Sequence, residues 1–98
     1  MQLAKVIGHV VATQKHPKFQ GMKLLLVQPH VAKDGAFAAS GPSVVAVDSV
    51  GAGLGEFVLV TQGSSARLTP ATRDSPTDAV IVGIVDTVQL GGSTVEKP

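Results

Sequence analysis

The chain has 98 residues, with eight Lys and Arg against seven Asp and Glu, no cysteine and a formal net charge of +1. A chain of this length is long enough for one domain only, and a net charge near zero does not favour nucleic acid or anionic lipid as a partner. The lack of cysteine excludes a disulfide framework and a thiolate metal site, and it is compatible with a reducing cytoplasm.

Hydrophobicity is the unusual property of this composition. Apolar residues make up 44% of the chain, yet there are three Phe and no Tyr or Trp, so small aliphatic side chains supply almost all of the apolar area. The interior of a small barrel cannot hold all of these apolar side chains. We therefore expect some of them on the outer faces of the barrel, at contacts between subunits. No stretch resembles a secretion signal or reaches the roughly 20 apolar residues of a membrane span, so neither is expected.

Five β-strands are predicted from short apolar runs and from the alternation of side chains between two faces. In chain order they cover residues 5–13, 23–28, 44–50, 56–62 and 80–88. The first strand has two largely apolar faces, and the second ends at Pro29. Gly83 in the last strand indicates a bulge or a close backbone approach.

Two connecting segments have weaker patterns. Residues 32–43 are rich in Gly, Ala and Ser and are predicted to form an exposed loop. Residues 63–68 are predicted to form a short helix that has Ser64 as its N-cap and stops before Pro70.

These elements together predict an all-β fold, a small five-stranded barrel of the oligonucleotide/oligosaccharide-binding type with one short helix. Residues 1–90 form this single domain, and residues 91–98 are a tail of low propensity that is frayed or ordered only by a neighbour. Strand edges that the barrel leaves open, and strands with two apolar faces, need to be paired or covered. A ring of identical subunits would do both.

Three glycines, Gly51, Gly53 and Gly55, lie between two apolar runs with β character. A dinucleotide site needs a strand, a glycine turn and then a helix whose N-terminus faces the phosphates, whereas another strand follows these glycines. We therefore predict a tight connection between strands, and no bound cofactor.

Four carboxylates lie at predicted strand ends or turns: Asp48, Glu56, Asp78 and Asp86. Acid–base catalysis would need two of them to converge in one pocket, and the sequence gives no sign of this. We expect them instead to accept hydrogen bonds from backbone N–H groups or to bind Arg67 and Arg73.

Neither the histidines nor the serines form a recognisable site. The spacings of His9, His16 and His30 match no common zinc pattern, so no metal is expected, and His9 is predicted to lie on the outer barrel face at a subunit contact. Ser64 and Ser65 lack the glycine pattern and the His/Asp partners of a nucleophile. We predict no catalytic residue.

The order of several short motifs resembles the EutN/CcmL family of shell proteins. The motifs are VIG at 6–8 running on to Ala12-Thr13, GMKLL at 21–25, AVD at 46–48 with VGAG at 50–53, GE at 55–56 leading to VLV at 58–60, GSSAR at 63–67, and DA at 78–79 leading to IVGIVD at 81–86. The resemblance implies a small β-barrel that forms a tapered homo-pentamer. Such pentamers close the fivefold vertices of a bacterial microcompartment, a carboxysome or metabolosome, whose facets consist of hexameric and pseudohexameric proteins.

From this resemblance we expect a non-enzymatic structural subunit located in a cytoplasmic microcompartment shell. The residues expected at the subunit interface are Ile7, His9, Val11, Ile81, Ile84 and Arg67. The small residues Gly51, Ala52 and Gly53 are expected near the fivefold axis, because they let five backbones converge. The alternatives are a barrel-type module for single-stranded nucleic acid, which the shortage of aromatic residues counts against, and a small enzyme.

Overall fold

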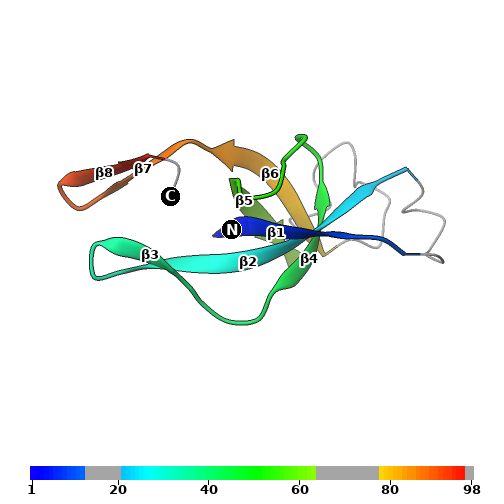
Figure 1. The fold of residues 1–98 in the computed structure, drawn as a ribbon, viewed down its shortest axis with the longest axis horizontal. Helices are drawn as coiled ribbons and strands as arrows, with labels where there is room; N and C mark the ends of the chain where they lie inside the picture. Colours follow the sequence, from blue (N-terminus) through cyan, green and yellow to red (C-terminus); the bar gives the residue numbers. More distant parts are fainter. Residues whose placement is uncertain (13–20, 64–77, 97–98) are drawn as a thin grey trace.

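The computed structural model describes residues 1–12, 21–63 and 78–96, and the elements in this part of the chain are all β-strands (Figure 1). They are β1 (Gln2–Val10), β2 (Lys23–Lys33), β3 (Ala36–Ala39), β4 (Val44–Asp48), β5 (Phe57–Gln62), β6 (Ala79–Val85), β7 (Thr87–Leu90) and β8 (Ser93–Glu96). The predicted all-β fold is confirmed. The helix predicted at 63–68 lies outside the described residues beyond Gly63.

Five of the strands pair in a ring. β1 pairs with β5, β5 with β6, β6 with β4, β4 with β2, and β2 again with β1. All of these pairs are antiparallel except β4 and β6, which run parallel over two residue pairs. Each strand of the ring therefore has a neighbour on both sides, although the β4–β6 pairing is short and leaves the remainder of those two strands unpaired on that side. These are the five strands that the sequence predicts, although β1 ends at Val10 rather than at Thr13.

The interior of the ring is filled by small side chains. In β2, Leu25 and Val27 point inward and are fully buried, whereas Leu24 and Leu26, which alternate with them, are only half-buried. The other buried residues of this cluster are Ala4, Val6, Ala46, Ala52, Val58, Val60, Ala79 and Ile81. Val47 and Val80 form a second, smaller cluster with Met22, Leu24 and Val82. Alanine and valine dominate because a five-stranded barrel has a narrow interior that larger side chains would overfill.

Two strands contain a bulge, where one residue has no partner on the neighbouring strand. In β1 the register against β2 shifts between Val6 and Gly8, which leaves Ile7 unpaired and half-exposed on the surface. In β6 the register against β5 shifts so that Val82, beside Gly83, is unpaired. The bulge predicted at Gly83 is therefore present, one residue earlier in the chain.

The prediction of an exposed loop at residues 32–43 is wrong, because a β-hairpin occupies most of this segment. β2 continues past Pro29 to Lys33 and returns as β3. Both turn residues, Asp34 and Gly35, have positive φ angles of 53° and 78°, as a type I′ hairpin turn requires. Pro29 is tolerated because its missing N–H falls between the β4 ladder, which ends at Val27, and the β3 ladder, which begins at His30.

The segment after β6 is also more ordered than predicted. The last predicted strand breaks at Asp86, and the chain then forms the β7–β8 hairpin as a separate two-stranded sheet. Gly91, with φ 64°, begins its turn. The β2–β3 and β7–β8 hairpins project from the same end of the barrel, and they give the molecule an elongated shape of 46 × 24 × 22 Å (Figure 1).

In the part of the chain that the structure describes, no helix has the length and apolar character needed to cross a membrane.

Candidate assembly surfaces

The first candidate surface is the glycine loop, residues 49–56, which joins β4 to β5. Asp48 at the end of β4 starts it: its Oδ1 accepts hydrogen bonds from the backbone N–H groups of Val50 at 3.0 Å and Gly51 at 3.1 Å. The other oxygen, Oδ2, lies 3.8 Å from Nζ of Lys23 on β2. Gly51 has a φ of 82°, a conformation that residues with a side chain rarely adopt.

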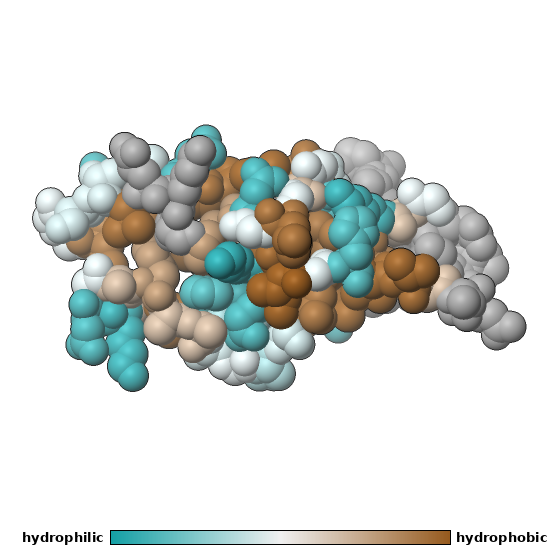
Figure 2. All heavy atoms as spheres, viewed as in Figure 1, coloured by the Kyte–Doolittle hydropathy of each residue, from teal (hydrophilic) through white to brown (hydrophobic). Residues whose placement is uncertain are grey.

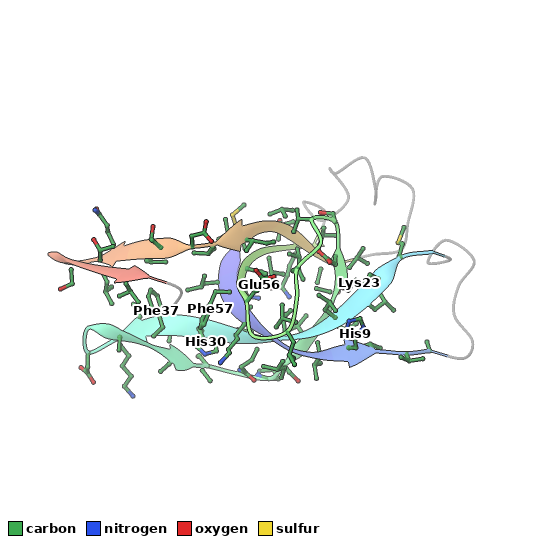
Figure 3. The ribbon with its side chains drawn as sticks, turned by 45° about the horizontal axis from the view of Figure 1, so that its top comes forward. His9, Lys23, His30, Phe37, Glu56 and Phe57 are labelled. Carbon is green, nitrogen blue, oxygen red and sulfur yellow. The ribbon has the colours of Figure 1, made fainter. Side chains whose placement is uncertain are left out.

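Further contacts hold the remainder of this loop against the barrel (Figure 3). Nζ of Lys23 donates to the carbonyl oxygen of Ala52 at 3.0 Å, and Oε1 of Glu56 accepts from the backbone N–H of Gly53 at 2.6 Å. The N–H of Gly55 donates to the carbonyl oxygen of Val6 at 2.9 Å. The Ala52 side chain is fully buried in the core. The loop is thus fixed at several points along its length.

These contacts show which groups two of the four carboxylates singled out in the sequence bind. Asp48 and Glu56 accept hydrogen bonds from backbone N–H groups, as the sequence predicts. Their oxygens are directed at their own loop and not at a shared pocket. The predicted partners Arg67 and Arg73 lie outside the described residues.

The second candidate surface is the cleft between the two hairpins, which sequence reasoning missed. Its floor is formed by Lys5, His30 and Phe57. The His30 and Phe57 rings meet edge to face, with centroids 4.9 Å apart and planes inclined at 73°, and Nζ of Lys5 lies 6.0 Å from the centre of the Phe57 ring. Phe37 with the adjoining β2–β3 turn lines one side, and Val95 of β8 lines the other.

Phe57 lies on the outer face of the barrel and not in its core. Its neighbours Val58 and Val60 point into the core, so Phe57 points outward by alternation, beside Lys5. It is nevertheless 7% exposed, because side chains of the cleft cover it. Figure 3 shows Phe37, Phe57 and His30 gathered where the two hairpins leave the barrel.

Aliphatic side chains are exposed over the rest of the barrel, as the composition predicts. Figure 2 shows hydrophobic patches between the hairpins and on the barrel, with hydrophilic residues between them. The large exposed apolar residues are Met1, Ile7, Val11, Val31, Val45, Val50, Leu54, Leu59 and Ile84, among which Val11 and Leu54 are 89% and 74% exposed. Isolated residues of this kind are ordinary, but this many on a small domain indicates surfaces that are covered in an assembly.

The residues predicted for the subunit interface do not share one environment. Ile7, Val11 and Ile84 are exposed, and so is His9. Ile81 is fully buried, because it pairs with inward-facing Val60, so its side chain has no surface to offer a neighbour and it is removed from the set. The sixth residue, Arg67, lies outside the described residues.

The residues predicted for the fivefold axis are placed as follows. Gly51 is exposed and Gly53 half-buried, whereas Ala52 points into the core of its own subunit. The exposed large apolar side chains of the loop are those of Val50 and Leu54. No group of three or more His, Asp and Glu side chains within the described ranges is arranged to hold a metal ion.

A family model described as "Ethanolamine utilisation protein EutN/carboxysome" matches residues 1–86. The chain belongs to this family. The resemblance stated from the sequence is thereby confirmed, and the matched range includes the barrel, the glycine loop and the β2–β3 hairpin. The β7–β8 hairpin follows the matched range almost directly.

Individual relatives agree with the family match. The chain is 53% identical over 90 residues to the bacterial microcompartment shell vertex protein PduN of Salmonella typhimurium, covering 90% of this chain and 98% of the relative. It is 48% identical over 95 residues to the carboxysome shell vertex protein CcmL of Synechocystis sp., covering 97% and 92%.

Solved structures show the same fold. The GrpN pentameric microcompartment shell protein from Rhodospirillum rubrum superposes with a TM-score of 0.81 at 47% identity, covering 93% of this chain and all of that one. A carboxysome subunit, CcmL, superposes with a TM-score of 0.86 at 49% identity, covering 96% and 95%.

Proposed function

We propose that this protein is a structural shell subunit that forms pentamers and caps the fivefold vertices of a bacterial microcompartment. The observation that carries the proposal is the likeness, over nearly the whole chain, to a relative described as a pentameric shell protein. Relatives named as shell vertex proteins, at 48% and 53% identity, support the same role. The protein is accordingly placed in a microcompartment shell within the cytoplasm.

The geometry of the subunit suits this role. Since each strand of the ring already has a neighbour on both sides, subunits associate mainly through outward-facing side chains, and the exposed aliphatic residues supply the apolar area for such contacts. Five copies joined head to tail close by rotation, and the angle between neighbours sets the curvature of the vertex. The remaining outer surface contacts the hexameric and pseudohexameric proteins of the facets.

Within this ring, Ile7, His9, Val11, Ile84 and Arg67 are the proposed contact residues. Ile7 and Val11 are the first residues to test, because both are exposed and lie on β1 or directly after it. Burying a side chain of this size removes enough apolar surface to contribute about 1.5–3 kcal/mol, so a few such residues suffice to hold neighbours together.

The loop around Gly51, Ala52 and Gly53 is proposed to face the fivefold axis. Substituting Ala52 does not test this, because a larger side chain would overfill the core. Leu54 is the suitable position, since its side chain is 74% exposed. If the loops converge, Leu54→Cys pentamers form disulfides between subunits on mild oxidation, whereas Val45→Cys pentamers, substituted at an exposed site on β4, do not. Absence of cross-links in Leu54→Cys pentamers would place the loop away from the axis.

Neither alternative function has an observation in its favour. Single-strand binders stack bases on exposed aromatic rings, and of the two aromatic residues that the structure describes Phe57 is buried and Phe37 half-buried, while Phe19 lies outside the described residues. Asp48 and Glu56, the carboxylates that the structure shows bonded, serve their own loop. We expect no nucleic-acid partner, no membrane partner, no cofactor and no catalysis.

The test of the proposal is shell closure. Co-expression with hexameric shell proteins should give closed polyhedral particles in electron micrographs, with this protein at the vertices. Hexamers without it should form sheets, tubes or particles with open corners. If the particles close equally well without the protein, the vertex role is wrong.

A further inference from the structure

We infer that Lys23 and Glu56 are positioning residues that together fix the orientation of one peptide group in the glycine loop, the group between Ala52 and Gly53. Lys23 begins β2 and Glu56 directly precedes β5, so side chains from two separate parts of the barrel act on the same group. The effect belongs to the loop of the single subunit, whereas its consequence for assembly rests on the proposed pentamer.

Both polar ends of this peptide group are bonded to a charged side chain. The carbonyl oxygen of Ala52 accepts a hydrogen bond from Nζ of Lys23 at 3.0 Å, and the N–H of Gly53 donates to Oε1 of Glu56 at 2.6 Å. The C=O and the N–H of a trans peptide group point in opposite directions. The group therefore lies between an ammonium group and a carboxylate, and each of these charges faces the end of the peptide that it attracts.

The backbone on its own leaves this orientation open. Turns of types I and II differ by a rotation of their central peptide group, which leaves the flanking Cα atoms nearly in place. The buried Ala52 side chain holds one Cα atom in the core, and Gly53 has no side chain to oppose such a rotation. A rotated group would turn its N–H toward the ammonium of Lys23 and its oxygen toward the carboxylate of Glu56. Both contacts are repulsive, so the two charges favour the observed orientation.

The position of Glu56 also accounts for glycine at residue 53. Gly53 lacks the positive φ of Gly51 and Gly55, so its backbone conformation alone would accept a side chain. A Cβ atom added to Gly53 would lie 3.4 Å from Oε1 of Glu56, at the tight limit of ordinary contact. The carboxylate therefore reaches the backbone N–H because no side chain separates the two.

Asp48 acts on this peptide group only through Lys23. Its Oδ2 lies 3.8 Å from Nζ of Lys23, beyond hydrogen-bond distance, and its Oδ1 accepts the N–H groups of Val50 and Gly51. The contact from Nζ to the Ala52 carbonyl is the shorter one. The carbonyl group is thus the main partner of the ammonium group, and the ion pair is secondary.

For the proposed pentamer the consequence is a uniform loop. If the loops converge at the fivefold axis, five copies of this peptide group surround the axis, and both polar ends of each are bonded within their own subunit. A ring with exact fivefold symmetry needs the same orientation in every copy. Lys23 and Glu56 supply that uniformity before the subunits meet.

Amide exchange measured residue by residue by NMR tests the role of Lys23. Lys23→Met removes the ammonium group and should raise the exchange rate of the Gly53 N–H about tenfold, because a charge-assisted hydrogen bond no longer holds the peptide group. Exchange in β5 should stay unchanged, and Lys23→Arg, which keeps the charge, should restore slow exchange. Lys33→Met removes the same charge from the exposed far end of β2 and should have no effect.

Two results would overturn the inference. One is unchanged exchange at Gly53 in Lys23→Met. The other is an equal rise throughout β5, because it would show a general loss of stability instead of a local release of the loop. The rates are measurable in a pentamer or in a monomer. A monomeric unsubstituted chain would contradict the proposed function, and the Gly53 rates would still decide the role of Lys23.

A crystal structure of the double variant Lys23→Met, Glu56→Gln tests both charges together. A glutamine side chain accepts from an N–H or donates to a C=O, so it bonds the peptide group in either orientation. Without the two charges, the group between Ala52 and Gly53 should be rotated or present in both orientations. The original orientation alone, in every copy of the chain, would overturn the inference.

Discussion

Asp48 uses each of its two oxygens for a different purpose. Oδ1 accepts the N–H groups of Val50 and Gly51, which begin the glycine loop, and Oδ2 faces Lys23, whose ammonium group in turn holds the carbonyl of Ala52. The Asp48 side chain is almost fully buried, at 1% exposed, while that of Lys23 is 42% exposed. The hydrogen bonds to the backbone therefore contribute more than the long and partly solvated ion pair.

Asp48→Ala should lower the free energy of unfolding by about 1–3 kcal/mol, because two backbone N–H groups lose their acceptor. Asp48→Asn keeps an acceptor oxygen and loses the charge, so it should cost less. Urea denaturation of both variants measures the difference. If the alanine variant is as stable as the asparagine variant, the hydrogen bonds do not hold the loop.

Two glycines with different backbone conformations give a second test at this scale. At Gly51, φ is 82° and no atom lies within 4 Å of an added Cβ, so Gly51→Ala should cost about 1–2 kcal/mol through backbone strain alone. Gly83 lacks a positive φ, and an added Cβ would lie 3.6 Å from Cδ1 of Leu59, an ordinary contact distance.

Gly83→Ala should accordingly raise stability by about 0.4–1 kcal/mol, because it restricts the unfolded chain. The two melting temperatures should therefore move in opposite directions from that of the unsubstituted protein. A loss of stability in Gly83→Ala equal to that in Gly51→Ala would mean that the bulge beside Gly83 does not accept a side chain.

At the scale of the elements, the pattern of apolar residues along the sequence predicts the positions of the barrel strands. It does not predict the pairing that joins these strands into a ring. Predicted strands 44–50 and 56–62 become β4 (Val44–Asp48) and β5 (Phe57–Gln62), although adjacent residues such as Ala46 and Val47 are both buried in the folded chain. The parallel pairing of β4 with β6, which completes the ring, joins segments far apart in the chain and has no local pattern.

The sequence analysis does not predict either hairpin, because parts of both have residues of low strand propensity. Residues 36–39 are mainly alanine and residues 91–94 are glycine and small polar residues, which have low strand propensity. The Asp34-Gly35 pair was the available signal, since Asp-Gly strongly favours a two-residue hairpin turn. The cleft could not be predicted, because it depends on where two hairpins from distant segments project in space.

Truncation after Asp86 tests whether the barrel folds without the β7–β8 hairpin. The five-strand ring ends with β6, and β7–β8 forms a sheet of its own, so the shortened chain should keep the circular dichroism and the cooperative unfolding of the barrel. Stability should fall by less than about 2 kcal/mol, because Phe57 loses only the cover that β8 provides. An unfolded truncated chain would show that the hairpin belongs to the folding unit of the barrel.

At the scale of the whole molecule, the proposed function follows from shape. The ring of five paired strands is the core of the unit, two hairpins project from one end of it, and aliphatic side chains are exposed on its outer surface. A head-to-tail contact between two different surfaces repeats from one subunit to the next and closes when the rotation per subunit is a simple fraction of a turn. With five subunits the product is a vertex.

The mass of the intact assembly in solution tests this account most directly. Native mass spectrometry or light scattering of the unsubstituted protein should give about 50 kDa, five times the 10.0 kDa of one chain, over a wide range of concentration. A 10 kDa monomer that persists at high concentration, or a stable ring with another number of subunits, would contradict the account.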